Sequence, residues 1–407
     1  MYLSRVYLQN IRGLRELDLD LCGEGDEPRR RTLIIGMNGT CKTTILRAIA
    51  LGLCDRADAN ALIAEPIGGF LSEGEGEGRI EIFLEHSRRS AYHWATRIQR
   101  ENGKEEVVEA EGSDPNGSRR PYLWQFLCGY GAGRYGVGYE SGREYRIADS
   151  VATLFDYRRT LLDPELTLRR LQDFLGTSRY DAILRGITNA LGLSIEDRIE
   201  LPKGGGVELS GPTIEGKIRL EGWADGYRMT FYWLLDLYGW AMRADCIDAE
   251  GNARGILLVD ELEQHLHPSM QAEILPRLSE ALPKMQLFAT THSPLVALDA
   301  RPEELVVLRR EGNEVVAETS IPDFTGYSAE DMLADERLFD TEVYGPEMRE
   351  KVVRYRSLAA TPRTERSAAE TRELRDLAFS IESHPLPESR ESDMVRELKR
   401  LIDKHNL

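Results

Sequence analysis

A glycine-rich loop near the amino terminus has residue types suited to binding phosphate. Residues 36–44 read GMNGTCKTT, which matches the pattern GxxxxGK[ST] except that Cys41 replaces the glycine before the lysine. In such a loop, successive backbone N–H groups surround the β- and γ-phosphates, the lysine neutralises their charge and the next hydroxyl binds Mg²⁺. An ordinary turn with an exposed lysine is the alternative. The predicted ligands are Gly36, Asn38, Gly39, Thr40, Cys41, Lys42, Thr43 and Thr44, with Thr43 on the metal.

Two acidic residues follow the apolar run at residues 256–259. That run predicts a central buried strand, and ligands in open α/β sheets bind at the carboxyl ends of such strands. We expect Asp260 to hold Mg²⁺ through water and Glu261 to orient and deprotonate the attacking water. Acids after an apolar strand also occur at ordinary strand-to-helix junctions, so this prediction depends on the phosphate loop as well.

Several histidines lie near these acids in the sequence. The stretch LFATTHSPLV predicts a buried strand ending in polar residues, which places His292 to contact the γ-phosphate or the attacking water. His265 and His267 lie two residues apart, unlike the i,i+4 spacing of helical zinc motifs. We therefore expect a structural turn ending at Pro268, with a zinc site as the alternative.

Hydrophobic periodicity predicts the elements that must position these residues. Strands are expected at residues 30–36, 256–259 and 285–294, and helices at 43–53, 229–244 and 270–282. Two strands meeting at Gly13 (6–21), meandering strands (79–110), helices (147–197), strands and turns (201–220) and a hairpin (304–320) account for most of the remainder. This alternation favours a largely parallel sheet with helices on its faces.

Composition sets limits on the class of protein. The 407 residues are 41% hydrophobic and 30% charged, as in soluble globular proteins, and no apolar run is long enough to cross a bilayer. We expect a cytoplasmic protein without membrane contact. The net charge of −17 opposes direct nucleic-acid binding unless a local basic patch forms. Two arginine groups are candidates, although solvated surface arginines are the favoured interpretation of both: Arg134, Arg143 and Arg146, and Arg354, Arg356, Arg363 and Arg366.

An ordered set of motifs resembles the heads of ABC-type ATPases. The set comprises QNIRG (9–13), GMNGTCKTT, YGAGR (130–134), WADGYR (223–228), LLVDELEQHLHP and THSP. It is most similar to the RecF/SMC-like and overcoming-lysogenisation-defect (OLD) ATPases and, among these, to the PtuA-like ATPases of Septu and retron defence systems. The resemblance covers residues 1 to about 310. The segment between Lys42 and Asp260 is too short for the long coiled coil of SMC proteins.

The resemblance implies a fold and its division into segments. The expected fold is an α/β ABC-type P-loop NTPase head with a mixed, largely parallel sheet, an antiparallel β subdomain, a helical insertion and a helical carboxyl-terminal tail. Residues 1–146 and 201–320 are expected to form the two parts of the head, 147–200 the helical insertion, and 321–407 a helical region that docks a partner.

The resemblance also implies further site residues. ATP and Mg²⁺ are the implied cofactors, with Glu261, His292 and Lys42 catalytic and Asn10 and Arg12 near the nucleotide. Two heads are expected to enclose ATP, so that the signature residues of one head contact the nucleotide bound by the other. Those signature residues are Asp225, Gly226, Tyr227 and Arg228; the alternative is a simple turn before the next helix.

Two residues depart from the usual motifs. Besides Cys41, Ala224 stands where the signature usually has serine. Losing that hydroxyl removes a γ-phosphate hydrogen bond worth about 1–3 kcal/mol. Slow hydrolysis or a nucleotide-bound resting state is therefore expected. No residue clearly fills the glutamine-loop position, for which Gln125 and Tyr130 are the candidates.

These observations favour an ATPase that acts as the sensor or regulatory subunit of an anti-phage defence complex. It would form a homodimer or larger homo-oligomer and control a separate nuclease subunit, with an HNH nuclease as the leading candidate. Nucleic acid would be contacted mainly through that complex. The alternatives are a RecF-like repair ATPase that binds DNA directly and a nucleotide-locked scaffold with little turnover.

Overall fold

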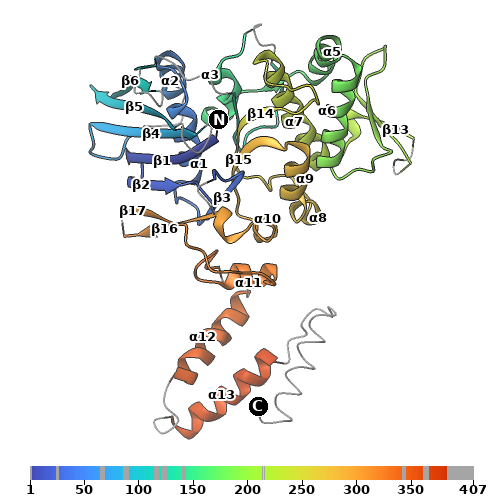
Figure 1. The fold of residues 1–407 in the computed structure, drawn as a ribbon. Helices are drawn as coiled ribbons and strands as arrows, with labels where there is room; N and C mark the ends of the chain where they lie inside the picture. The colour runs from blue at the N-terminus through green and yellow to red at the C-terminus, as the bar shows by residue number, and fades with distance from the viewer. Residues whose placement is uncertain are drawn as a thin grey trace. The chain divides into compact units, whose positions relative to one another are not determined.

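The computed structural model divides into two compact units, residues 1–340 and 341–407 (Figure 1). The residues it describes are 2–23, 27–64, 69–85, 91–113, 119–120, 126–139, 144–212, 214, 216–312, 314–341, 345–360 and 366–382. The predicted division into residues 1–146, 147–200, 201–320 and 321–407 stays a prediction.

A mixed, largely parallel sheet forms the centre of the first unit. Its order is β17-β16-β3-β15-β14-β8, and every neighbouring pair is parallel except β16 with β17. This arrangement confirms the predicted fold class. The strands are β3 (Arg31–Gly36), β8 (Leu127–Tyr130), β14 (Arg254–Val259), β15 (Lys284–Thr290), β16 (Leu305–Glu311) and β17 (Glu314–Glu318).

An antiparallel sheet lies beside it (Figure 1). Its order is β2-β1-β4-β5-β6-β7, and alternate residues of β4 are buried, as expected for a sheet with one covered face. Asn102 and Gly103, with φ of 50° and 77°, join β5 to β6 in the conformation that tight hairpins need. The strands are β1 (Tyr2–Ile11), β2 (Leu14–Asp20), β4 (Glu77–Glu85), β5 (Ala91–Glu101), β6 (Lys104–Ser113) and β7 (Arg119–Arg120).

Helix α1 (Lys42–Gly52) packs between the two sheets. Its apolar residues share one buried cluster with Ile34 of β3 and with Ile80 and Ile82 of β4. A Cβ on Gly52 would lie 2.6 Å from a side-chain carbon of Ile82, so the absence of a side chain allows this close approach. The helix that begins in the phosphate loop is therefore fixed along one flank by the antiparallel sheet.

The other face of the parallel sheet packs against α7 (Asp225–Arg243). Leu257 and Val259 point into this second cluster, whereas Ile256 and Leu258 belong to the first, as the alternation of side chains along a strand requires. Helix α7 begins four residues before the predicted start at residue 229, so the signature residues form its first turn and not a turn before it.

The segment from residue 147 onward is less helical than predicted. Helices α3 (Ile147–Ser150), α4 (Ala152–Phe155), α5 (Pro164–Leu175) and α6 (Thr177–Ala190) are present, but β10 (Leu161–Leu162) interrupts them and pairs with β9 (Val137–Tyr139). The backbone N–H of Leu162 donates to the buried carboxylate of Asp236, a tertiary contact that periodicity does not reveal. A small sheet of β11 (Arg198–Glu200), β12 (Glu208–Ser210) and β13 (Lys217–Arg219) follows, as expected, and the short η2 (Leu220–Gly222) leads to α7.

The prediction of a single helix at residues 270–282 is wrong. The structure has two helices there, α8 (Pro268–Gln271) and α9 (Ile274–Ala281). Pro276 lacks the N–H that a continuous helix would direct to the carbonyl of Ala272, and its ring would clash with that carbonyl. A new helix therefore starts just before the proline.

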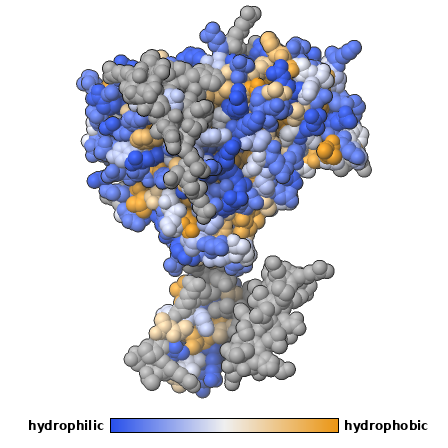
Figure 2. Space-filling model, viewed as in Figure 1, coloured by the Kyte–Doolittle hydropathy of each residue, from blue (hydrophilic) through white to orange (hydrophobic). Residues whose placement is uncertain are grey.

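The remaining described elements are mostly short. They are α2 (Arg56–Ile63), α10 (Pro294–Ala297), η3 (Pro302–Glu304) and α11 (Ala329–Ala334) in the first unit, and α12 (Pro346–Ala360) and α13 (Ala368–Glu382) in the second. Arg354 of α12 pairs with Glu373 of α13 at 2.8 Å. Within the described part of the chain, no helix combines the length and apolar character needed to span a membrane. On the face shown in Figure 2, hydrophilic residues cover much of the first unit, with apolar residues scattered among them.

The fully buried amide of Gln286 joins the two sheets. Its Oε1 accepts the N–H of Leu3 at 2.7 Å, while Nε2 donates to the carbonyls of Leu3 and Arg29 at 2.9 and 2.8 Å. One side chain on β15 thus bonds both to β1 and to the chain entering β3. These bonds help to fix the antiparallel sheet against the strand that leads into the phosphate loop.

Gln286→Met keeps the side-chain length but removes these three hydrogen bonds. We expect the free energy of unfolding to fall by about 3 kcal/mol, because buried backbone groups lose their partners. Urea unfolding measures this as a lower midpoint at unchanged slope. The control is Gln99→Met, whose amide bonds to Glu77 at an exposed position and which should change stability by less than about 0.5 kcal/mol. Equal effects of the two variants would contradict the role of Gln286.

Candidate nucleotide-binding site

A cavity of about 330 Å³ lies where β3, β14 and β15 end. It brings together the loop residues, both acids and the histidine that the sequence placed far apart. The residues lining it are Arg12, Asn38, Gly39, Thr40, Cys41, Lys42, Thr43, Thr44, Arg47, Tyr157, Asp260, Glu261 and His292. The position agrees with the rule that open α/β sheets bind ligands at the carboxyl ends of their strands.

The phosphate loop is closed by its own polar contacts. Lys42 Nζ donates to the carbonyls of Gly36 and Met37 at 2.8 and 2.9 Å, and Thr40 Oγ1 donates to the Met37 carbonyl at 2.8 Å. A Cβ on Gly36 (φ 149°) would lie 2.5 Å from the Leu308 carbonyl oxygen, so only glycine fits where β3 meets the loop. Burial lowers the pKa of Lys42, and the nearby carboxylates of Asp260 and Glu261 oppose this shift.

The backbone at Cys41 explains why the loop pattern normally has glycine there. Cys41 caps α1 with φ 65° and ψ 19°, a left-handed conformation that costs a residue with a Cβ about 1–2 kcal/mol. Glycine, which has no Cβ, adopts this conformation without that cost. The thiol lies close to Gly13, where a Cβ would come within 3.0 Å of Sγ. Glycine at position 13 therefore leaves room for the cysteine.

The carboxylate of Asp260 connects three elements. It accepts hydrogen bonds from Thr43 Oγ1 at 2.8 and 3.0 Å and from Thr290 Oγ1 at 2.7 Å, and the residue is only 2% exposed. Thr290 Oγ1 in turn accepts the backbone N–H of Glu261 at 2.8 Å. A hydroxyl and a carboxylate this close provide the hard oxygen ligands that Mg²⁺ prefers, so the predicted pair Thr43 and Asp260 fits that ion.

Glu261 and His292 face the same cavity with opposite pKa shifts. Burial, Asp260 and Glu263 raise the pKa of Glu261, whereas burial and the charge of Lys42 lower the pKa of His292. Glu263, a residue without a predicted role, fixes residues 291–292 by accepting the His292 N–H at 2.7 Å and the Thr291 hydroxyl at 2.6 Å. Its place two residues after Glu261 was the available sequence signal.

Arg134 of the YGAGR motif is not a solvated surface arginine. It is 4% exposed, and its guanidinium donates to the carbonyls of Gly131, Asp260 and Glu261 at 3.1, 2.6 and 2.8 Å. Burial lowers its pKa to about 10. The arginine therefore clamps the turn in which Glu261 has a left-handed φ of 48°. The YGAGR motif alone does not predict this role for Arg134.

The other arginines proposed for basic patches are engaged or lie outside the described residues. Arg146 pairs with Asp58, and Arg354 with Glu373. Arg366 donates to the carbonyl of Ala359 at 2.7 Å. The side chains of Arg143, Arg356 and Arg363 are not among those described.

Neither candidate for the glutamine loop lines the cavity in the described residues. Gln125 falls outside them. Tyr130 is fully buried, and its hydroxyl donates to Asp236 at 2.8 Å within the core. Burial raises the pKa of Asp236 to about 6. Tyr130 is therefore a core residue and not a nucleotide ligand.

The predicted signature residues lie apart from the cavity walls. Asp225, Gly226, Tyr227 and Arg228 form the first turn of α7, where Arg228 donates to Asp225 at 2.5 Å. Ala224 occupies the N-cap position and offers no side-chain cap. Two residues of QNIRG were predicted to lie near the nucleotide. Arg12 lines the cavity, whereas Asn10 does not line it and donates to the carbonyl of Glu77 at 3.1 Å.

The two histidines after Glu263 lie in a turn. His265 has φ 65°, and His267 caps α8 by accepting the Ser269 N–H through Nδ1 at 3.3 Å. This geometry fits the turn that the sequence predicts. Across the described residues, no group of three or more His, Cys, Asp or Glu side chains is arranged to hold a metal ion.

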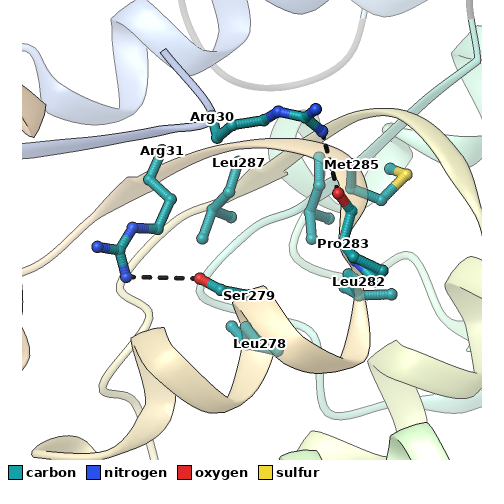
Figure 3. Close-up of a pocket in the computed structure, with 9 residues that line it drawn as sticks. Arg30, Arg31, Leu278, Ser279, Leu282, Pro283, Met285 and Leu287 are labelled. Atoms are coloured by element: carbon teal, nitrogen blue, oxygen red, sulfur yellow. Dashed lines mark hydrogen bonds between the residues drawn. The ribbon is translucent and has the colours of Figure 1, made fainter.

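A smaller cavity of about 160 Å³ lies between α9, β14 and β15 (Figure 3). Its walls are mainly apolar. The two arginines at its edge already have partners, because Arg30 donates to the Pro283 carbonyl at 3.0 Å and Arg31 donates to Glu304 at 2.8 and 2.9 Å. Its mainly apolar lining and its engaged arginines suit phosphate less well than the cavity at the strand ends.

Comparison with known proteins agrees with the motifs at this site. The family model "AAA domain" matches residues 5–116, and "AAA domain, putative AbiEii toxin, Type IV TA system" matches residues 236–299. Over 384 residues the chain is 26% identical to the Septu protein PtuA of Bacillus mycoides, an alignment that covers 92% of this chain. The chain is similar to PtuA. It spans about half the length of this relative, since the alignment covers 50% of the PtuA protein.

Other similarities are shorter or more distant. A retron Vc95 probable ATPase of Vibrio cholerae is 39% identical over 57 residues, which are 14% of this chain and 11% of that protein. Among solved structures, an SMC head domain from Thermotoga maritima matches 78% of this chain and 98% of its own, with 14% identity and a TM-score of 0.45. The sequence matches confirm the predicted relationship to PtuA-like and retron ATPases.

Cys41→Gly should raise the free energy of unfolding by about 0.5–1 kcal/mol, because it relieves the left-handed strain at a cost in chain entropy. ATP binding should be retained or improved, as measured by titration calorimetry. Cys22→Gly is the matched control, because Cys22 is also half-buried but is not among the residues with positive φ, and it should destabilise the protein. Strong loss of ATP binding in Cys41→Gly would show that the thiol has a direct role.

Proposed function

We propose that this chain binds and hydrolyses ATP with Mg²⁺ as the ATPase of an anti-phage defence complex. The observation that carries the proposal is the convergence of Lys42, Thr43, Asp260, Glu261 and His292 in one cavity. These residues follow three strand ends, the first of which is more than two hundred positions from the other two in the sequence. Their meeting at one place matches what phosphoryl transfer to water requires: positioning of phosphates, charge neutralisation and a base.

The residues divide these tasks between them. Backbone N–H groups of residues 38–43 and the cation of Lys42 hold the β- and γ-phosphates at the start of α1. Thr43 and Asp260 would hold Mg²⁺, which would neutralise charge on the phosphate oxygens. Glu261, with its raised pKa, accepts the proton of the attacking water. His292, held by Glu263 and neutral because its pKa is lowered, donates or accepts a hydrogen bond beside the γ-phosphate.

We further propose that two copies enclose the nucleotide. The signature residues at the start of α7 do not line the cavity of their own chain, and Ala224 and Asp225 are exposed. A second copy could therefore present this helix start, with its partial positive charge, to the γ-phosphate. Ala224 contributes no hydroxyl to that contact, which favours slow turnover.

The effector in this proposal is a separately encoded nuclease, of the HNH type. Relationship to a Septu protein supports the defence setting. Co-purification with the product of a neighbouring nuclease gene tests it, and DNA cleavage by the purified ATPase alone would contradict this division of labour. The RecF-like alternative needs a basic surface, but Arg134 is buried and Arg146 and Arg354 are paired with acids.

Lys42→Ala should abolish ATP binding, because it removes the cation from the phosphate loop. Glu261→Gln should retain ATP binding but lower the hydrolysis rate by about 10²–10⁴-fold through loss of the general base. Phosphate release and equilibrium binding, measured on the same preparations, separate the two effects. Equal, near-zero rates in wild type and Glu261→Gln would instead favour the nucleotide-locked scaffold.

The rate of hydrolysis should fall on the acid side of neutrality. The base works as a carboxylate, so a raised pKa of Glu261 moves its protonation to higher pH than for an ordinary glutamate. His292→Gln should lower the rate, but the pH at which the rate falls on the acid side should stay unchanged. If His292→Gln no longer shows this fall in rate at low pH, the titrating group is the histidine and not Glu261.

A further inference from the structure

Three residues of the cavity belong neither to the phosphate loop nor to the strand ends. Arg12 lies between β1 and β2, Arg47 lies five positions after Lys42 on α1, and Tyr157 follows α4. They form a cluster of their own: Arg47 Nη2 donates to the Tyr157 hydroxyl at 3.4 Å, and the charge of Arg47 adds to burial in lowering the pKa of Arg12. The neighbours of Lys42, in contrast, are Asp260, Glu261 and Glu263.

Tyr157 lies in a fixed turn, but its side chain is exposed to solvent. Its exposed fraction is 50%, although it borders a cavity. The turn around it is fixed by Asp156, whose side chain accepts the Arg158 N–H at 2.9 Å and whose carbonyl accepts the Arg159 N–H at 3.1 Å. Arg47 is 5% exposed and also donates to the Leu154 carbonyl at 2.5 Å. The arginine that contacts Tyr157 is therefore itself held in place by burial and by a second hydrogen bond.

The YGAGR motif makes room for this turn. A Cβ on Gly131 would lie 2.2 Å from the Thr153 carbonyl oxygen, and a Cβ on Gly133 would lie 2.8 Å from Tyr157 Cβ. Both glycines therefore allow the segment 153–157 to pack against the end of β8. The same motif provides Arg134, which clamps the turn carrying Glu261. One short stretch thus positions both Tyr157 and the proposed base.

We propose that the Tyr157 ring is the surface on which the nucleobase of the bound nucleotide stacks, with Arg12 and Arg47 beside it. The inference rests on the proposed function. The γ-phosphate must face Glu261 and His292. Arg12 and Arg47 are not among the charges that act most strongly on these two residues, whereas both adjoin Tyr157, so the nucleoside is placed on the tyrosine's side of the cavity. An open aromatic ring beside guanidinium groups suits the flat face of a base, and stacking is tolerant of which base is present.

Comparing the affinities for two ligands, one with a nucleobase and one without, tests the inference. Wild type should bind both ATP and inorganic tripolyphosphate in the presence of Mg²⁺. Tyr157→Ala should weaken ATP about tenfold and leave tripolyphosphate unchanged, because only ATP carries a base. Tyr157→Phe keeps the ring and should bind both ligands as wild type does. Tyr135→Ala is the matched control, since Tyr135 is 57% exposed but does not line the cavity, and it should change neither affinity.

The possible failures are distinguishable. Unchanged ATP affinity in Tyr157→Ala, or an equal loss of both ligands, would overturn the stacking role while the phosphate site stands. Failure of wild type to bind either ligand would overturn the proposed function and the stacking role with it.

Discussion

The carboxylate of Asp260 is the contact on which the site depends. It stands at the end of β14 and accepts hydrogen bonds from Thr43, at the start of α1, and from Thr290, at the end of β15. The Thr43 hydroxyl and the Asp260 carboxylate are also hard oxygen ligands of the kind that Mg²⁺ prefers. The sheet order places β3 beside β15 and β15 beside β14, so three strand ends and one helix start meet at this one group.

The fold fixes this meeting point from two sides. Gln286 bonds β15 to the antiparallel sheet, and Gly52 lets α1 pack closely on the same sheet. On the other side, Arg134 reaches from the end of β8 to the carbonyls of Asp260 and Glu261. Strain at the left-handed residues Cys41 and Glu261 is thus held by contacts that are themselves buried.

Much of this architecture could be predicted from the sequence, and the exceptions have physical causes. The strand-loop-helix around Lys42 and the acids after β14 have local signals, so their elements were predicted correctly. The break before Pro276 and the strand β10 were missed, the first because a proline outweighs periodicity and the second because its pairing depends on tertiary contacts. Arg134 was misread because its residue type favours the surface, whereas three backbone carbonyls bind it in the core. The positions of Asn10 and Tyr130 likewise depend on packing that a motif cannot show.

The central claim is that the loop at Cys41 and the acids after β14 form one site for ATP and a metal ion. The most direct measurement is the anomalous diffraction of Mn²⁺ in crystals grown with a non-hydrolysable ATP analogue. We expect an anomalous peak between Thr43 and the Asp260 carboxylate, with the analogue's phosphates over the start of α1. Nucleotide bound without a metal at these two residues, or bound elsewhere on the chain, would contradict it.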